Sequence, residues 1–374
     1  MKIAITAGGG GHFASALAVI ESLQGRASVT VIGRKYALEG DLALSFEYQM
    51  AEALHIPFIS LKTGRLQRKI SPHTFLSLLK VPSGLWHAHK ILRELLPDVL
   101  VSFGGYVAFP VVLAAFTQRI PIVLHEQTLE AGLANRLSTP FASKICVSWR
   151  TSESFFPKNK TIFTGLPLRK TILRPVNKPS IVVSEGRGKS IYITGGSSGA
   201  HAINVLIEKS LDKLLEKYIL YHQTGDARVF GDFERLSFYR RSLSKEKQQR
   251  YFLSKFLSPE DAGWFLSNAD LVICRSGMNT VSELLYYGKP CLLIPLPYGQ
   301  RNEQKMNASL LYTIGIAEVV NQQIITPEMF LEKITTMMHT LSDYKKNATE
   351  AKSMLQIDAT EQVIQAIYDV KKKK

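Results

Sequence analysis

The sequence has little cysteine and no apolar run long enough to cross a membrane. Its three cysteines, at positions 146, 274 and 291, are widely spaced and lie in apolar, strand-like stretches. Single cysteines of this kind predict reduced core residues, as in a cytosolic protein, and not a disulfide framework. The longest apolar stretch, Val107 to Phe116, contains a proline and reaches about half of a membrane span. We therefore expect no transmembrane segment.

Several sequence motifs that would indicate a function directly are also missing. No Gly-Lys-Ser/Thr follows the glycines at 8–11, which excludes a Walker phosphate loop. No acidic residue closes the second expected strand, where Ile32 leads to Gly33 and Arg34, so a dinucleotide fingerprint is not formed. The first residues have too short an apolar run for a signal peptide and suit a buried strand. No Asp-x-Asp element lies at a plausible strand end, and we predict neither a metal ion nor a cofactor.

Acidic residues are scarce relative to basic ones. Lys plus Arg number 46 against 31 Asp plus Glu, a formal net charge of +15. Such a balance indicates acidic partners, namely nucleic acid, phosphorylated substrates or an anionic membrane. Aromatic residues alternate with cations in no sheet-like stretch beyond residues 75–86, and no nucleic-acid motif occurs. We therefore expect no nucleic-acid partner.

Alternating strands and helices predict an α/β chain of two domains. At 374 residues the chain is long for a single core. A strand, four glycines and a helix at 12–23 open a series that is typical of a doubly wound parallel sheet. The pattern breaks at 174–189, where two prolines and two glycines occur, and then restarts. The expected strands lie at 3–6, 29–32, 58–61, 99–103, 122–125, 144–147, 191–194, 219–222, 251–253, 271–274 and 291–294.

These signals place the domain boundaries. The first domain spans 1–173, a linker 174–189 and the second domain 190–345. Helices are expected near 201–216, 279–287 and 302–313, and the chain is helical by pattern from about 327 onward. We expect the last segment, 346–374, to form a helix that packs back on the first domain.

Glycine turns at strand ends are the first candidate sites. Four glycines before His12 let the backbone approach a ligand at a helix start, where unpaired N–H groups favour phosphate. The imidazole can accept a proton from a hydroxyl or bind a phosphate. The alternative is a helix-capping residue, and position alone favours neither reading.

Two further strand ends in the first domain carry polar groups. Gly104, Gly105 and Tyr106 follow one strand, and His125, Glu126 and Gln127 close the next. Ligands of doubly wound sheets bind at this carboxyl edge. Alternatively, His125 and Glu126 pair with each other or cap a helix at 131–137.

The second domain repeats the arrangement. Gly195 to Ala200 is a second glycine-rich turn, and Arg169 lies just before the linker, where it can neutralise charge. An apolar strand at 271–274 then runs into Arg275-Ser276-Gly277 and a helix with Glu283, an arrangement that suits a nucleotide diphosphate and its ribose. The alternatives are Ser276 as an N-cap with a solvated Glu283, and Asn302 as the cap of the helix that contains Gln304.

Residues 62–86 combine basic residues with apolar anchors such as Leu85 and Trp86. This composition suits an interfacial patch on an anionic membrane. A buried helix beside an ordinary basic loop is the alternative.

The motifs in chain order are GGGGH, FGGYVAFP, HEQTLEAGLANR, GLPLR, GGSSGA, HQTG, RSGMNTVSE, NEQKMNA and DATEQV. Together they resemble the MurG family of glycosyltransferases (glycosyltransferase family 28) over nearly the whole chain. Single glycine turns are weak evidence, whereas HEQ, GGSxGA and RSGxxTxSE in combination are specific.

The resemblance implies a GT-B fold, two Rossmann-like domains facing a cleft, with a lipid-linked acceptor and the membrane at the first domain and UDP-GlcNAc at the second. It implies an inverting, metal-independent hexosyltransferase that moves GlcNAc from UDP-GlcNAc to the C4 hydroxyl of MurNAc in undecaprenyl-pyrophosphoryl-MurNAc-pentapeptide, which converts lipid I to lipid II in peptidoglycan synthesis. A peripheral location on the cytoplasmic face of the cell membrane follows, with cell-wall or division proteins as possible partners.

The resemblance also assigns residues. His12 becomes the candidate base or a ligand of the acceptor diphosphate, and Glu126 a second catalytic residue. Glu283 is expected to hold the ribose, Ser197 and residues 276–280 the diphosphate, and Gln304 the GlcNAc hydroxyls. The donor set is Gly10, Gly11, Arg169, Ser197, Leu257, Ser276, Gly277, Met278, Asn279, Thr280, Glu283 and Gln304. The acceptor set is Gly104, Gly105, Tyr106, His125, Gln127, Thr128 and Asn135.

Several positions depart from the family pattern. The family's GGTGGH is Ala7 to His12 in this chain, and its following Pro is Ser15. Thr128 and Leu166 stand where the family has Asn, and Ser198 where it has Gln. These changes fit either a divergent member or a GT-B relative with another nucleotide sugar or another lipid acceptor.

Overall fold

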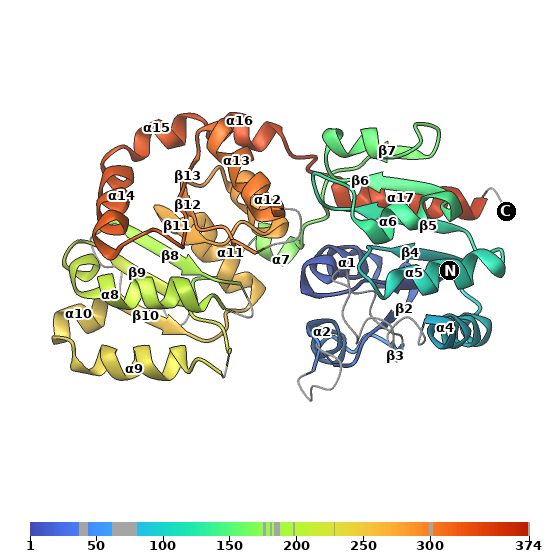
Figure 1. Cartoon of the computed structure of the whole chain (residues 1–374), viewed down its shortest axis with the longest axis horizontal. Helices are drawn as coiled ribbons and strands as arrows, with labels where there is room; N and C mark the ends of the chain where they lie inside the picture. Colours follow the sequence, from blue (N-terminus) through green and yellow to red (C-terminus); the bar gives the residue numbers. More distant parts are fainter. Residues whose placement is uncertain are drawn as a thin grey trace. The chain divides into compact units, whose positions relative to one another are not determined.

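The computed structural model describes residues 1–36, 44–61, 81–174, 177–179, 182, 188–196, 199–227, 229–298 and 302–372. The chain divides into two compact units, residues 1–169 with 356–374, and residues 170–355. Each unit is built on a parallel sheet with helices on both faces (Figure 1). The expected α/β class with two doubly wound domains is therefore confirmed.

The unit boundaries differ from those expected at 173 and 345. Residues 170–173 form α7 (Lys170–Leu173), which belongs to the second unit. The Tyr287 hydroxyl donates to the Ile172 carbonyl at 2.6 Å. A Cβ on Gly263 would lie 2.3 Å from the same carbonyl oxygen, so only glycine allows this close approach. Much of the expected linker, 174–189, lies outside the described residues.

Within the described residues, the first unit contains a seven-stranded sheet in the order β3-β2-β1-β4-β5-β6-β7. Six of these strands match the expected ones to within two residues at each end. The seventh, β7, is a three-residue edge strand that the sequence pattern did not indicate. The strands are β1 (Lys2–Thr6), β2 (Ser28–Gly33), β3 (Phe58–Ser60), β4 (Val99–Ser102), β5 (Ile122–Glu126), β6 (Lys144–Val147) and β7 (Thr161–Phe163).

Alternate strand residues of this sheet serve two apolar layers. Ile3 and Ile5 pack with α1 and α17, whereas Ala4 packs in the opposite layer with α4 and α5. The terminal helix α17 lies against α1 and buries Val363 and Ile367 there. The helices are α1 (Gly10–Leu23), α2 (Phe46–Ala53), α4 (Val81–Leu95), α5 (Ala108–Thr117), α6 (Leu133–Ser138), η1 (Thr139–Phe141), η2 (Arg150–Phe155) and α17 (Ala359–Lys372).

The described part of the second unit contains a six-stranded sheet in the order β10-β9-β8-β11-β12-β13. All expected strands are present, and β13 is a further edge strand of three residues. The strands are β8 (Ser190–Thr194), β9 (Ile219–Gln223), β10 (Tyr251–Ser254), β11 (Leu271–Cys274), β12 (Cys291–Leu293) and β13 (Ala317–Val319).

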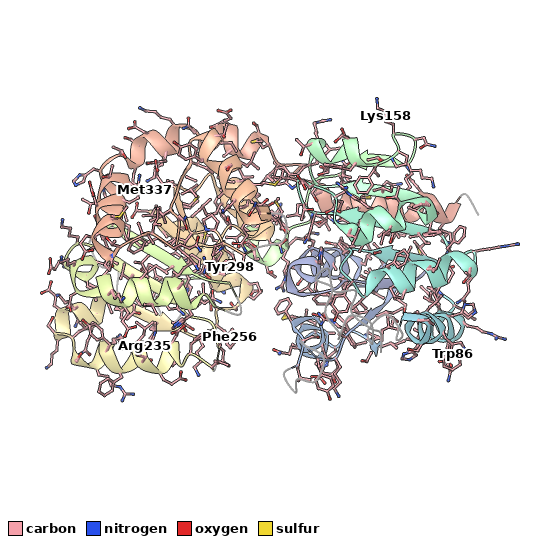
Figure 2. All side chains as sticks on the ribbon, viewed as in Figure 1. Trp86, Lys158, Arg235, Phe256, Tyr298 and Met337 are labelled. Carbon is pink, nitrogen blue, oxygen red and sulfur yellow. The ribbon has the colours of Figure 1, made fainter. Side chains whose placement is uncertain are left out.

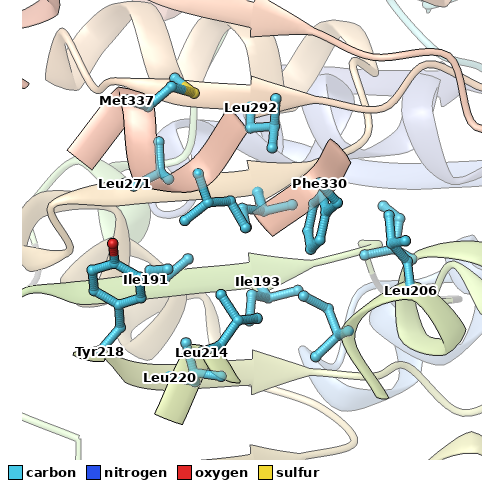
Figure 3. Packing of buried hydrophobic residues seen from close by; sticks show 14 of the residues in the cluster. Ile191, Ile193, Leu206, Leu214, Tyr218, Leu220, Leu271, Leu292, Phe330 and Met337 are labelled. Carbon is cyan, nitrogen blue, oxygen red and sulfur yellow. The ribbon is translucent and has the colours of Figure 1, made fainter. Parts of the chain in front are cut away.

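One apolar layer of the second unit lies between this sheet and helices α8 and α14. Ile191 and Ile193 of β8 pack with Leu214 of α8 and Phe330 of α14 (Figure 3). The helices are α8 (His201–Lys217), α9 (Asp232–Ser242), α10 (Lys245–Arg250), α11 (Pro259–Asn268), α12 (Met278–Tyr287), α13 (Glu303–Ile314), α14 (Pro327–His339), α15 (Leu341–Lys346) and α16 (Ala348–Ser353).

None of the described helices is both long enough and apolar enough to span a membrane. Of the expected interfacial patch, 62–80 lies outside the described residues. The described end, Trp86 on α4, is 70% exposed (Figure 2).

All three cysteines are free and fully buried, as expected. Burial raises the pKa of each thiol well above its ordinary value. They are therefore inert core residues.

Buried histidines in each unit predict a loss of stability in mild acid. Burial lowers the pKa of His125 to about 4 and that of His222 to about 3. The unfolded chain takes up these protons first, so the stabilisation is complete above the unfolded pKa of about 6.5 and is lost as pH falls through the folded values. Between pH 6.5 and 4 each histidine accounts for roughly 3 kcal/mol. Urea unfolding at several pH values checks this. His222→Gln should flatten the dependence, and an unchanged slope would contradict the assignment.

Candidate active site

Two glycine turns of the first unit touch each other. The Gly8 N–H donates to the Gly104 carbonyl at 2.9 Å. A Cβ on Gly105 would lie 2.6 Å from the Gly8 Cα, and Gly104 and Gly105 have φ values of 88° and 84°. Side chains are excluded by both contact and backbone conformation. The turns after β1 and β4 are thereby fixed at the carboxyl edge of the sheet, where the sequence placed a ligand.

His12 is the third residue of α1 and is partly exposed. Gly9 occupies the N-cap position, so the alternative reading of His12 as the capping residue is wrong. The Nδ1 atom is buried and has no hydrogen-bond partner among the described residues. Burial lowers the imidazole pKa, and the Glu126 carboxylate and the Phe103 backbone, which favour the charged form, oppose this effect. The ring is therefore neutral near pH 7, the form that accepts a proton.

Glu126 is buried, with 1% of its surface exposed, and its carboxylate organises the following loop. It accepts from the Thr128 N–H at 3.0 Å, the Thr128 hydroxyl at 2.6 Å, the Gly132 N–H at 2.9 Å and the Asn135 amide at 2.9 Å. Gly132 is the N-cap residue of α6, so one of these bonds lies at the start of that helix, but Gly132 itself provides no side-chain cap and the His125 ring bonds to residues outside this helix. The negative charge of the carboxylate also acts on His12, whose pKa it raises against the lowering by burial.

The expected acceptor residues differ in how far they are exposed to solvent. Gly105, Tyr106 and Thr128 are partly exposed at the edge of the sheet. In contrast, His125 is fully buried, between the Ser148 hydroxyl at 3.3 Å and the Gly165 carbonyl at 3.4 Å.

Gly104, Gln127 and Asn135 are also buried. Direct ligand contact by His125 or by these three residues is therefore not supported. Asn135 instead donates to the His125 carbonyl and to Glu126, which fixes the loop.

Arg169, assigned to the donor by resemblance, is already paired. Its Nε and one terminal nitrogen lie 2.9 and 2.5 Å from a single oxygen of Glu21, a residue of α1. This largely buried pair ties the end of the first unit to the helix that carries His12. Gly10 and Gly11, from the same donor set, are exposed at the start of α1.

The second unit repeats the close glycine packing. A Cβ on Gly199 would lie 2.0 Å from the Thr224 carbonyl oxygen. The Asn204 amide donates to that oxygen at 3.1 Å and to Asp232 at 2.7 Å. His222 contacts Asn204 at 3.0 Å on the other side. The glycine-rich turn after β8 is thus braced from the core, although Ser197 and Ser198 lie outside the described residues.

The turn after β11 is held by α13. Ser276 is fully buried, and its hydroxyl donates to the Gln304 carbonyl at 2.7 Å. The Asn307 amide donates to the Ser276 carbonyl at 3.0 Å. Gly277, and not Ser276, is the N-cap of α12, and it provides no side-chain cap. The helix start at 277–280 therefore offers backbone amides and a favourable dipole end to an anion.

The remaining donor candidates lie at the same edge. Glu283 is half-buried on α12, one turn after Thr280. Burial raises the pKa values of Tyr192 and Cys274, and the charge of Glu283 adds to this effect. The Gln304 side-chain carbonyl accepts from the Leu296 N–H at 2.9 Å, which fixes the loop after β12. Leu257 is in the short turn from β10 to α11, beside the exposed Phe256 (Figure 2).

The alternative that Asn302 caps α13 is confirmed for its position but not for its side chain. The residue occupies the N-cap position, in the left-handed region with φ 56°, but its side chain makes no capping hydrogen bond.

Comparison with known proteins matches two consecutive parts of the chain to domains of one family. Residues 3–147 match the Glycosyltransferase family 28 N-terminal domain and residues 190–363 match the Glycosyltransferase family 28 C-terminal domain. A relative from Lachnoclostridium phytofermentans is 32% identical, with all of both chains covered. The chain belongs to glycosyltransferase family 28.

That relative is named UDP-N-acetylglucosamine--N-acetylmuramyl-(pentapeptide) pyrophosphoryl-undecaprenol N-acetylglucosamine transferase, as is one from Lawsonia intracellularis that is 32% identical over 99% of this chain and 97% of its own length. Among solved structures, MurG of Acinetobacter baumannii has a TM-score of 0.70 at 26% identity and covers 99% of this chain and 100% of its own. A UDP-N-acetylglucosamine 2-epimerase, at 15% identity and TM-score 0.63 over 97% of this chain and 94% of its own, shares the fold alone. The GT-B fold is thereby shown.

Departures from the family 28 pattern have visible local effects. Ser15, in place of Pro, donates to the Gln127 side chain at 3.4 Å and so links α1 to the loop after β5. Thr128, in place of Asn, turns its hydroxyl toward Glu126 and the Glu130 carbonyl. Leu166, in place of Asn, is a buried apolar residue.

Sequence reasoning missed the residues that hold these loops from behind, among them Glu21, Glu47, Asn204 and Asp232. None of these four residues lies in one of the strand ends or glycine-rich turns that the sequence marks as candidate ligand sites. An acidic residue in the first turn of an amphipathic helix, as Glu47 is in α2, is normally read as solvated. No local signal distinguishes a buried one.

Gly9 carries a conformational prediction. It has φ 92° and ψ 157°, a region that is essentially confined to glycine. A Cβ there meets nothing within 4 Å, so the cost of Gly9→Ala is that of the backbone alone, about 1–3 kcal/mol of unfolding free energy. Gly132→Ala, at φ −64° and with Glu126 at an ordinary 3.6 Å, is the matched control and should change stability by less than about 0.5 kcal/mol. Equal urea midpoints for the two variants would refute the assignment.

Proposed function

We propose that the chain is the transferase that moves GlcNAc from UDP-GlcNAc to the C4 hydroxyl of MurNAc in undecaprenyl-pyrophosphoryl-MurNAc-pentapeptide, lipid I to lipid II in peptidoglycan synthesis. The observation that carries the proposal is similarity along the entire chain to relatives named for this reaction. The reaction joins the acceptor oxygen to C1 of GlcNAc, breaks the bond from C1 to the diphosphate, and inverts C1. UDP leaves, and the hydroxyl proton goes to a base.

His12 is the group we assign as this base. A neutral imidazole with a depressed pKa, beside the Glu126 carboxylate, accepts a proton and is stabilised as a cation once it has done so. Glu126 is then an electrostatic partner held by its own loop contacts. Tyr106, Gly105 and Thr128 are the acceptor contacts that we retain from the expected set.

The second unit binds the donor in this proposal. The amides at 277–280 stabilise the charge that develops on the leaving diphosphate, Glu283 accepts from the ribose hydroxyls, and Gln304 binds the sugar. Ser276 supports the turn from below through its contacts with α13. The backbone near Leu257 reads the uracil, and Arg169 changes partner from Glu21 if it contacts the donor.

The protein is peripheral and lies on the cytoplasmic face of the cell membrane in this proposal. What supports contact with an anionic surface is the net charge of +15 and the exposed Trp86 beside the basic segment from Lys62. Binding to cell-wall or division proteins is a further expectation of the same kind.

One observation favours a second candidate, a GT-B transferase with another lipid acceptor. The Thr128 side chain is directed into the Glu126 loop, so any contact made by the family's Asn is lost on the acceptor side.

The first experiment measures UDP release from UDP-GlcNAc by purified protein in detergent, with and without a lipid I analogue. UDP-glucose and UDP-GalNAc serve as controls. Release that depends on the analogue and is restricted to UDP-GlcNAc supports the proposal. Binding of UDP-GlcNAc without stimulation by the analogue would reject the acceptor and favour the second candidate.

His12→Ala should lower the turnover number by roughly a hundredfold or more, because the transition state then lacks its proton acceptor. The dissociation constant of UDP should not change. His339→Ala, an exposed histidine of α14, is the control and should leave turnover unaltered. Near-normal turnover by His12→Ala would remove His12 from the role.

Glu283→Gln should weaken UDP binding by roughly tenfold or more, since a hydrogen bond to a charged group contributes about 1.5–3 kcal/mol. Uridine should lose affinity by the same factor, because the lost contact is to the ribose. Calorimetry with both ligands checks this, and Glu260→Gln, at an exposed position of α11, is the control. A loss for UDP that is absent for uridine would place Glu283 at the diphosphate instead.

A further inference from the structure

Glu47 is a buried carboxylate that the proposed reaction does not use. It lies in the first turn of α2, is 1% exposed, and its Oε1 atom has no hydrogen-bond partner among the described residues. Burial raises its pKa, while the Arg34 guanidinium and the Gly9 backbone N–H favour the charged form. A carboxylate is rarely retained in such a place without a partner that needs it.

The surroundings of Glu47 are those of the glycine turn. Phe46, its neighbour, lies 3.5 Å from where a Cβ on Gly10 would be, and its ring meets Phe13 edge-to-face at 6.3 Å. Ser45 caps α2 through the Tyr48 N–H, which fixes the helix start. The beginning of α2 is therefore a brace behind the beginning of α1.

Arg34 completes the arrangement. It lies 3.8 Å from Glu47 and stacks over the ring of Tyr106 at 4.5 Å. Tyr106 directly follows Gly104 and Gly105, which contact Gly8. Glu47 thus connects both glycine turns, one through Gly9 and the other through Arg34 and Tyr106.

We propose that Glu47 is a positioning residue for transfer, which acts with Phe46 beside Gly10 and with Arg34 over Tyr106 to fix the start of α1 and the place of His12. The inference rests on the proposed function for its effect on turnover.

Kinetics provide the first test, with Glu52 as the matched control because it is an exposed glutamate near the end of the same helix. Glu47→Ala should lower the turnover number by tenfold or more and leave the UDP dissociation constant within twofold. Glu47→Gln, which keeps the length of the side chain and one of its oxygens, should recover most of the loss. Glu52→Ala should change neither quantity. Turnover equal in Glu47→Ala and Glu52→Ala would overturn the proposal.

A spectroscopic arm does not depend on the reaction. In protein labelled at histidine and glycine, the Gly9 amide and the His12 ring signals, assigned with Gly9→Ala and His12→Gln, should both shift in Glu47→Gln. They should stay in place in Glu52→Gln, and the His339 signal should be constant throughout. Unshifted Gly9 and His12 signals in folded Glu47→Gln would overturn the proposal even if transfer is confirmed. Shifted signals in a protein without acceptor-dependent UDP release would instead reject the proposed function and keep the brace.

Discussion

The contact on which the first unit depends is backbone against backbone, between the turn at Gly8 and the turn at Gly104 and Gly105. Two peptide segments approach this closely only where neither carries a side chain. The contact joins the ends of β1 and β4, the strands at which the order of the sheet reverses direction. The position of the proposed base follows, because α1 begins directly after the first turn.

The second unit has a similar close approach of two turns, between Gly199 and the Thr224 carbonyl, again at the ends of neighbouring strands. Here the turn is held by a buried chain of hydrogen bonds that runs from Tyr251 through His222 and Asn204 to Asp232. Burial lowers the pKa of His222 to about 3, so the imidazole in this network is neutral except in strong acid. The buried histidine that helps to hold this turn therefore also makes the unit less stable in acid.

Most of the fold could be predicted from the sequence, because buried parallel strands are continuous apolar runs and their turns contain glycine. The strand at 271–274 was predicted to the residue. The edge strands β7 and β13 were not, since three residues with little burial leave no pattern.

The candidate site was predicted at the level of loops and only partly at the level of side chains. Glycine turns indicate the ligand edge, but whether Glu126 or Ser276 faces a ligand or its own loop depends on which residue it meets in the fold, Asn135 for the first and Gln304 for the second. Spacing cannot reveal such partners.

In the proposed function this basic protein binds two diphosphate-containing molecules, so acidic side chains near the site should not face these ligands. Glu126 and Asp232 each help to fix a loop at a ligand edge, as we propose for Glu47, and each of the three is at most 5% exposed. A carboxylate is well suited to this task, because it accepts several hydrogen bonds from backbone and amide groups at once. Its charge repels an anionic ligand only if it faces that ligand, and burial behind the loop avoids this. The excess of Lys and Arg can then act at the surface, while the acids near the site act on the protein itself.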